Sequence, residues 1–235
     1  MRGQMDRAAA ERALRAKGWL SEQPAAIQAD LLRHARLQHL APGDYAYQIE
    51  DPPGGIYGVA KGGFAISVTA DISGPHLAHI ARSGTWFGDS SVLTGRPRRV
   101  SAQAVEASVA LYVPLDPLEH LIQSNAAVAR ALGSLSSTRF RILAGVVSDL
   151  LIRRADRRIA ATLLRVTGVL EGERPDDPAG FRLTQSELGE MANASRHLVN
   201  RTLGRFEASG WVACSYNRIA IRKPKALAAF VRDGD

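Results

Sequence analysis

The stretch at residues 183–211 reads LTQSELGEMANASRHLVNRTLGRFEASGW, and it decides the fold of the C-terminal part of the chain. Near its start, Thr184 and Glu187 form an S/T-x-x-E pattern, in which each side chain reaches the backbone N–H of the other residue and starts a helix. Asn193 comes two turns later, and asparagine tolerates the left-handed conformation that a tight turn between helices needs. The pattern therefore predicts a short helix that ends in a tight turn.

A second helix is predicted directly after this turn. Ser195 is a good N-cap, and the apolar residues Val199, Leu203 and Phe206 recur at i, i+4 and i+7 to form an inward stripe. The opposite face collects basic, amide and small residues: Arg196, His197, Asn200, Arg201 and Gly204. A short helix, a tight turn and a second helix with such donors at its start predict a helix-turn-helix, whose second helix enters the DNA major groove.

An amphipathic helix shows polar residues on its outer face in any protein, so the following segment matters. After Gly210, the run WVACSYNRIAIRKP contains two short β-rich segments around Tyr216 and Asn217, which predicts a hairpin. A hairpin in this place is the wing of a winged helix-turn-helix. The order LTxxELGxxxxxSRxxVxRxLxRFExxG resembles the DNA-binding domain of the bacterial Crp/Fnr regulators almost position for position.

The resemblance implies an α+β protein with three parts. These are N-terminal helices with a jelly-roll β-roll sensor like that of cyclic-nucleotide-binding domains (residues 1–115), a long dimerisation helix (116–154) and a winged helix-turn-helix (155–235). It further implies a homodimer that regulates transcription from a palindromic promoter site in double-stranded DNA and works with RNA polymerase. The residues that it assigns to DNA are Ser195, Arg196, His197, Asn200 and Arg201.

Composition agrees with this class of protein and excludes others. With 235 residues, of which 46% are hydrophobic, the chain can build one large core or two moderate ones. The net charge is +7, and residues 153–235 carry 15 basic and 10 acidic side chains, which fits contact with phosphates. A single cysteine, Cys214, excludes an internal disulfide and a cysteine-built zinc or iron–sulfur site. No apolar run approaches the roughly 18 residues of a membrane span, and no signal peptide is recognised, so a cytoplasmic protein is expected.

The sequence pattern of the first half of the chain changes once, from helical to β-rich. Residues 5–38 are predicted to be helical, with an interruption near Gly18–Pro24. From Leu40 to Pro114, short β-rich runs alternate with Pro/Gly turn signals, which predicts an antiparallel sandwich or barrel. The family resemblance makes this barrel the jelly roll.

The region from Pro117 to about Gly168 is predicted to be the longest helical part. Apolar residues recur there at three- and four-residue intervals, and the stripe expected at a two-fold interface is Leu132, Leu135, Leu143, Val146 and Leu150. Such a stretch exceeds what one small domain buries, which favours a seam between two chains. The alternative is a helix buried within its own domain.

The effector question turns on WFGDSSVLTGRPRRVS, residues 86–101. In the resembled family, a Gly-Glu pair holds the ribose of a cyclic nucleotide, and an arginine about ten residues later holds its phosphate. Here the candidate pocket residues are Gly88, Asp89, Ser90, Arg98, Arg99 and Arg139. However, Asp89 is one methylene shorter than glutamate, Arg99 replaces the expected Ser or Thr, and Leu143 and Ala144 replace hydroxyl residues. We therefore expect weak or no binding of cyclic AMP, and no other cofactor.

Other chemistries find little support in the sequence. His76 and His79 are spaced i, i+3, which places them on opposite faces of a strand, so neither a metal site nor a haem ligand is predicted. No catalytic motif is recognised, and an enzyme is not expected. Two alternatives stay open: a regulator that does respond to cyclic AMP or cyclic GMP, and a ligand-binding module whose DNA specificity has degraded.

Overall fold

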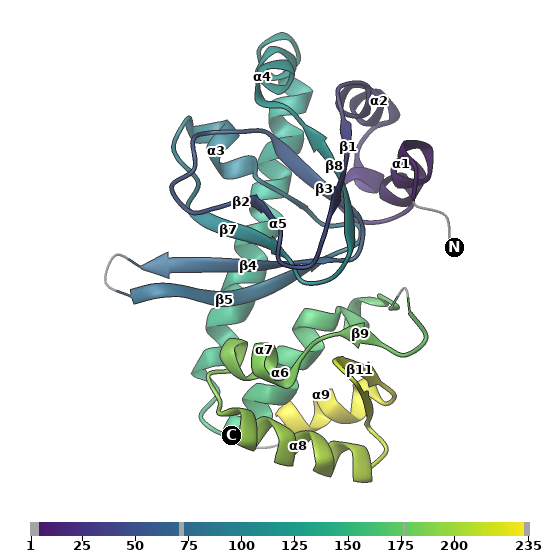
Figure 1. Ribbon diagram of the computed structural model, residues 1–235, viewed down its shortest axis with the longest axis vertical. Coiled ribbons are helices and arrows are strands. Elements are labelled where there is room, and N and C mark those ends of the chain that lie inside the picture. Colours follow the sequence, from purple (N-terminus) through teal and green to yellow (C-terminus); the bar gives the residue numbers. More distant parts are fainter. Residues whose placement is uncertain (1–4, 71–72, 176, 233–235) are drawn as a thin grey trace. The chain divides into compact units, whose positions relative to one another are not determined.

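The computed structural model describes residues 5–70, 73–175 and 177–232. The chain divides into two compact units. The first contains Met1–Pro75 and Ile80–Arg141, and the second contains His76–His79 and Ile142–Asp235. Antiparallel sheets and helices make up the units, as the α+β prediction requires (Figure 1).

Three helical segments and eight strands form most of the first unit. The helical segments at its start are α1 (Arg7–Ala16), η1 (Trp19–Glu22) and α2 (Ala25–Arg33). The strands are β1 (Arg36–Leu40), β2 (Tyr45–Tyr47), β3 (Ile56–Lys61), β4 (Gly63–Ala70), β5 (Ser73–Arg82), β6 (Trp86–Phe87), β7 (Val100–Ala104) and β8 (Ser108–Val113). The predicted N-terminal helices are thus confirmed with their interruption, except that Arg36 to Gln38 already belong to a strand. The short helix α3 (Asp89–Thr94) inside the predicted β region was missed.

The strands form two four-stranded sheets in the orders β1-β8-β3-β6 and β2-β7-β4-β5. Because neighbouring side chains on a strand point to opposite faces, β8 serves two cores at once. Val109, Leu111 and Val113 join the core under the helices, while Ala110 faces the core between the two sheets. Figure 1 shows α1 beside β3 and β8, the strands whose outer face it covers.

Two consecutive helices follow the strands, and the second of them continues into the second unit. They are α4 (Leu115–Ser124) and α5 (Ala126–Leu151), separated by a break at Asn125. The expected interface stripe is partly wrong: Leu132 and Leu135 are buried in the core of their own chain, at 0% and 2% exposure. The indole Nε1 of Trp19 donates to the carbonyl of Ala131 at 3.1 Å and helps hold this part of α5 against the N-terminal helices. The reason for the error is that periodicity marks an apolar face without naming its partner.

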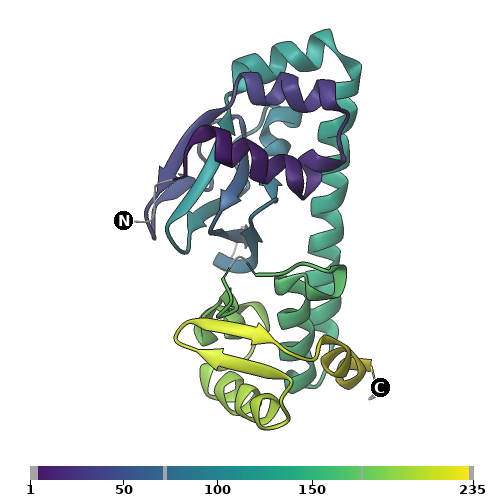
Figure 2. The same cartoon turned by 90° about the vertical axis from the view of Figure 1, so that its right-hand side faces the viewer.

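The second unit contains the predicted winged helix. Its elements are α6 (Ala155–Thr167), η2 (Val169–Glu171), β9 (Phe181–Arg182), α7 (Gln185–Met191), α8 (Arg196–Ala208), β10 (Val212–Ser215), β11 (Arg218–Ile221) and α9 (Pro224–Arg232). The hairpin of β10 and β11 lies beside α8 (Figure 2), and β9 adds a third strand that the sequence did not predict. Among the described residues, no helix has the length and apolarity to cross a membrane.

Candidate nucleic-acid interface and effector pocket

The first helix of the helix-turn-helix begins as predicted. The backbone N–H of Glu187 donates to Thr184 Oγ1 at 3.1 Å, and the backbone N–H of Thr184 donates to Glu187 Oε2 at 2.7 Å, which completes the capping box. Arg182 pairs with the other carboxylate oxygen of Glu187. Burial alone would raise the pKa of Glu187, but the hydrogen bonds from Arg182 and Thr184 outweigh it and hold the pKa below its usual range. The carboxylate therefore stays ionised and fixes the start of α7.

The turn between α7 and α8 is tight because two residues permit it. Asn193 has φ +46°, the left-handed conformation expected of it. Gly189 comes so close to the turn that a Cβ there would lie 2.7 Å from the carbonyl oxygen of Ala194. The backbone N–H of Ala194 in turn donates to the carbonyl of Gly189 at 2.8 Å. The glycine therefore lets the two helices approach each other.

The second helix presents the predicted faces. Ser195 Oγ accepts from the backbone N–H of Leu198 at 3.2 Å and caps α8. The predicted inward residues Val199, Leu203 and Phe206 are at most 2% exposed. The whole predicted outward set is exposed: Arg196, His197, Asn200, Arg201 and Gly204. The four polar side chains of this set thus share the free face in the first two turns of α8.

The wing closes the other side of a groove that α8 borders. The groove has a volume of about 490 Å³, and its walls come from the start of α7, from α8 and from the hairpin: Leu183, Thr184, Gln185, Ser186, Arg196, Asn200, Leu203, Cys214, Ser215, Tyr216, Asn217, Arg218 and Ile219. Tyr216 at the hairpin tip is 92% exposed, and Asn217 turns the chain with φ +53°. Burial raises the pKa of Cys214 to about 11, so its thiol is neutral.

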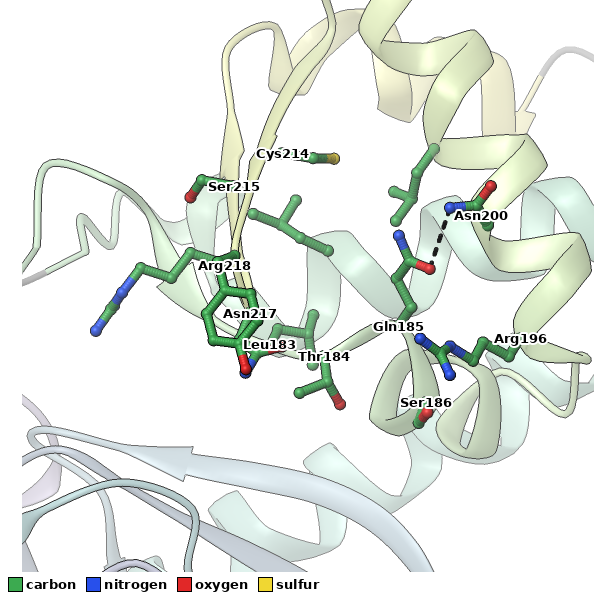
Figure 3. A pocket seen from close by; sticks show the side chains of 13 residues that line it. Leu183, Thr184, Gln185, Ser186, Arg196, Asn200, Cys214, Ser215, Asn217 and Arg218 are labelled. Atoms are coloured by element: carbon green, nitrogen blue, oxygen red, sulfur yellow. Dashed lines mark hydrogen bonds between the residues drawn. The ribbon is translucent and has the colours of Figure 1, made fainter.

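One contact in this groove was missed by the sequence analysis. The side-chain amide of Asn200 donates to Gln185 Oε1 at 3.3 Å, and Figure 3 shows this bond between the two helices, with Arg196 close to it. Gln185 is the first residue of α7, directly after its cap, and this position was the signal that could have identified it. A side chain there faces the same groove as the start of α8.

In the candidate effector pocket, Asp89 is paired with side chains of its own chain. Asp89 is 1% exposed, and its Oδ1 lies 3.0 Å from Nε of Arg139 on α5. Ser136 Oγ donates to Asp89 Oδ2 at 2.5 Å. Gly88 has φ +102° and starts the short helix that carries Asp89. Ser136 was not among the predicted pocket residues, because nothing in its sequence surroundings marks it.

The two adjacent arginines differ in burial. Arg98 is 4% exposed, and its guanidinium donates to the carbonyls of Gly88 and Gly55, both at 2.8 Å. It also lies 4.1 Å from the ring centre of Tyr47, whose pKa burial raises. Arg99 is exposed, and its guanidinium lies 3.7 Å from the carboxylate of Glu50. Two adjacent arginines can belong to a solvated turn, but the burial of Arg98 rules this out for that residue.

The remaining candidate residues are exposed. Ser90 is exposed, and so are Leu143 and Ala144 on α5. His76 is exposed on β5. Among the residues that the structure describes, no group of three His, Cys, Asp or Glu side chains could hold a metal ion.

Comparison with known proteins identifies both halves of the chain. Residues 37–125 match the family model of the cyclic nucleotide-binding domain, and residues 157–230 match that of the Crp-like helix-turn-helix domain. A CRP-like cAMP-activated global transcriptional regulator of Mycobacterium tuberculosis is 25% identical over 213 residues, which cover 89% of this chain and 94% of the relative. The fumarate and nitrate reduction regulatory protein of Salmonella typhimurium is 25% identical over 208 residues, which cover 83% and 78%.

Solved structures agree on the fold. The structure of FixK2 from Bradyrhizobium japonicum superposes with a TM-score of 0.71 at 19% identity and covers 83% of this chain and 96% of that one. The regulator CLP of Xanthomonas campestris gives a TM-score of 0.65 at 20% identity, over 84% of this chain and 99% of that one. With a winged helix-turn-helix, a β-roll and relatives that are transcription regulators rather than enzymes, the chain belongs to the Crp/Fnr family of DNA-binding transcription regulators and carries a cyclic-nucleotide-binding domain.

Proposed function

We propose that this regulator works as a homodimer that reads a palindromic promoter site through Arg196, His197, Asn200 and Arg201, and that cyclic AMP is not its effector. The observation that carries the proposal is the division of α8 into two faces. Val199, Leu203 and Phe206 are buried against the rest of the second unit, while these four polar side chains are exposed together in the first two turns of α8. The second helix of a helix-turn-helix enters the major groove with its N-terminal residues.

The chemistry of each side chain suggests the base that it reads. Arg196 can grip guanine O6 and N7 with two hydrogen bonds, and Asn200 suits adenine N6 and N7. Neutral His197 offers a donor or an acceptor, whereas protonated histidine offers only donors. Arg201 reaches a base edge or a nearby phosphate. Ser195 contributes by fixing the start of α8 through its cap.

The exposed apolar residues of α5 support the homodimer. Phe140, Leu143, Val147 and Leu150 are 74%, 44%, 58% and 43% exposed, and they follow one another at intervals of three, four and three residues. This is the a/d spacing of a coiled-coil seam, in which two helices bury such a stripe against each other. A two-fold axis between the helices would give two copies of α8 for the two half-sites, about one helical turn of DNA apart. Contact with RNA polymerase is part of the same proposal.

The contacts of the effector pocket support the second part. The groups that a cyclic nucleotide would need are engaged elsewhere: Arg98 donates to two backbone carbonyls, and Asp89 is paired with Arg139. The alternative, a response to cyclic AMP or cyclic GMP, is favoured by the name of the Mycobacterium tuberculosis relative, which is described as cAMP-activated. The two hypotheses differ in whether a cyclic nucleotide changes DNA binding.

In-vitro selection from random DNA by the purified protein tests the proposal. The expected product is a palindromic motif that is the same with and without cyclic AMP or cyclic GMP. Arg196→Ala should relax the preference at one base pair of each half-site and cost roughly 1–3 kcal/mol of binding free energy. Arg12→Ala, which removes an exposed arginine of α1, is the matched control and should change neither.

Three outcomes would contradict parts of the proposal. An unchanged motif and affinity for Arg196→Ala would refute the assignment of α8 as the helix that reads the bases, the reading helix. A motif that emerges only with cyclic nucleotide would favour the alternative effector. Selection of no motif by the wild-type protein would favour a ligand-binding module that has lost its DNA specificity.

A further inference from the structure

One guanidinium in the second unit collects carbonyl groups from two distant parts of the chain. Arg158, on the first turn of α6, donates from Nε to the carbonyl of Ala192 at 2.5 Å and from Nη2 to that of Asn193 at 3.0 Å. From Nη1 it donates to the carbonyl of Ile152 at 2.7 Å. The first two acceptors lie in the turn between α7 and α8, and the third follows the last residue of α5.

These carbonyls need such a donor. The last carbonyl groups of a helix have no partner within the helix, and a cation at that end also interacts favourably with the helix dipole. Arg158 therefore satisfies orphan acceptors at the ends of α5 and α7 with one rigid, planar group, whose five donors have fixed directions. A lysine, with a single ammonium on a flexible stem, cannot span the same acceptors.

A second arginine fastens α6 to α5 from the other end. Arg165 Nε donates to Asp149 Oδ2 at 2.6 Å, and both side chains are largely buried. The end of α5 is thus tied to α6 at two places, and of these two arginines Arg158 is the one that also donates to the turn that leads into α8. Because α8 begins within three residues of Asn193, a shift of this turn shifts the whole reading helix.

We propose that Arg158 is a positioning residue that fixes the direction of α8 relative to the end of α5, and that it thereby sets the distance between half-sites that the dimer accepts. The inference rests on the proposed function, because it assumes two copies of α8 joined through α5. Arg158 itself reads no base in this proposal. One added base pair moves a half-site by about 3.4 Å and rotates it by roughly 35°, so a rigid connection penalises it and a loosened one tolerates it.

The test measures binding to operators whose two half-sites are separated by the selected spacing or by one base pair more or less. Arg158→Met keeps the length of the side chain and removes its donors, and Arg153→Met, at an exposed neighbouring position, is the control. Wild-type protein and the control should prefer the selected spacing by tenfold or more. Arg158→Met should bind the selected spacing about tenfold more weakly and lose most of the preference, while the base preference within each half-site stays unchanged.

Salt dependence separates this role from contact with phosphate. Loss of a phosphate contact would lower the slope of log affinity against log salt by about one and weaken all spacings alike. For a positioning residue, the slope stays that of the wild-type protein. Arg158→Lys provides a second variant that retains the charge, and it should lose spacing preference too, because charge alone does not hold the turn.

Several results would overturn the inference. An unchanged spacing preference in Arg158→Met, or a loss shared equally by all spacings, would refute the role of Arg158 while leaving the proposed function intact. Circular dichroism that shows both Arg158 variants unfolded would assign a general stabilising role instead. A wild-type protein that selects no paired half-sites would refute the proposed function, and this inference would fail with it.

Discussion

The substitution Arg98→Met tests whether Arg98 stabilises the fold or is kept for binding an anionic ligand. Arg98 is buried, and its guanidinium satisfies the carbonyls of two buried residues, Gly55 and Gly88. Methionine keeps much of the volume and removes the donors. If the guanidinium serves the fold, the variant must be less stable without any ligand. If it were held in place for an anionic ligand, removal of a buried cation would leave the unliganded protein equally stable or more so.

The magnitude follows from the contacts. Each buried carbonyl that loses its partner costs about 1–3 kcal/mol, and the contact of Arg98 with the ring of Tyr47 contributes about 0.5–2 kcal/mol. Relief of the desolvation penalty of the cation offsets part of this loss. We therefore expect Arg98→Met to lower the free energy of unfolding by about 3 kcal/mol. At about 2–4 °C per kcal/mol for a chain of this size, Tm should fall by roughly 6–12 °C.

Thermal denaturation of the unliganded protein, followed by circular dichroism, is the assay. Arg99→Met is the matched control, because Arg99 is the exposed neighbour, and its substitution should stay within about 0.5 kcal/mol of wild type. Cyclic AMP at 1 mM should leave Tm of the wild-type protein unchanged, whereas a ligand at 100 times its Kd adds about 2.7 kcal/mol. An Arg98→Met variant as stable as wild type, together with a rise of Tm on addition of cyclic AMP, would refute the reasoning.

Three further predictions concern the dimer, the capping box and the reading helix. If the proposed homodimer forms, Phe140→Glu should convert it into the 25.3 kDa monomer in light scattering. Burial of each copy of Phe140 at the two-fold interface would contribute about 1.5–3 kcal/mol to association, so the substitution should raise the dimer Kd by roughly a hundredfold or more. The control Arg141→Glu, at an exposed position of the same helix, should have little effect. Glu187→Gln should lower stability by about 0.5–2 kcal/mol at pH 7 and by less at pH 3, in thermal melts with Glu171→Gln as control. The sign follows from the lowered pKa of Glu187: its contribution is complete above the unfolded pKa of about 4.3 and disappears as pH falls through the folded pKa, so an equal loss at both pH values would contradict it. His197→Glu should shift the selected base pair toward one that presents cytosine N4, by about 1–3 kcal/mol, and an unchanged motif would remove His197 from the reading set.

The parts of the fold that the sequence predicted well are those that depend on neighbours along the chain. The capping box at Thr184 and Glu187, the left-handed turn at Asn193 and the inward stripe of α8 are all local, and the structure confirms each. The hairpin around Tyr216 and Asn217 belongs to the same group, because its turn and both strands are contiguous.

The parts that could not be predicted depend on contacts between distant residues. The strands β6 and β9 have two residues each and exist only because β3 and β11 pair with them. Leu132 and Phe140 both lie on apolar positions of α5, yet the first is buried in its own chain and the second is 74% exposed. Sequence periodicity assigns both to an apolar face, and only the position of the N-terminal helices distinguishes them.

The effector pocket shows that the residues of a ligand-binding motif can also make structural contacts. The Gly-Asp pair and the arginine ten residues later have the spacing of a ligand site, but in this chain Asp89 and Arg98 each have partners within the chain, which a ligand that contacts them must displace. Asp89 holds α3 to α5 through Arg139 and Ser136, and Arg98 holds the loop at Gly55 to the start of α3. These contacts give both residues a structural reason to remain even without a cyclic nucleotide. A ligand for this domain must therefore either replace the Asp89–Arg139 pair with comparable contacts or bind where neither residue is disturbed.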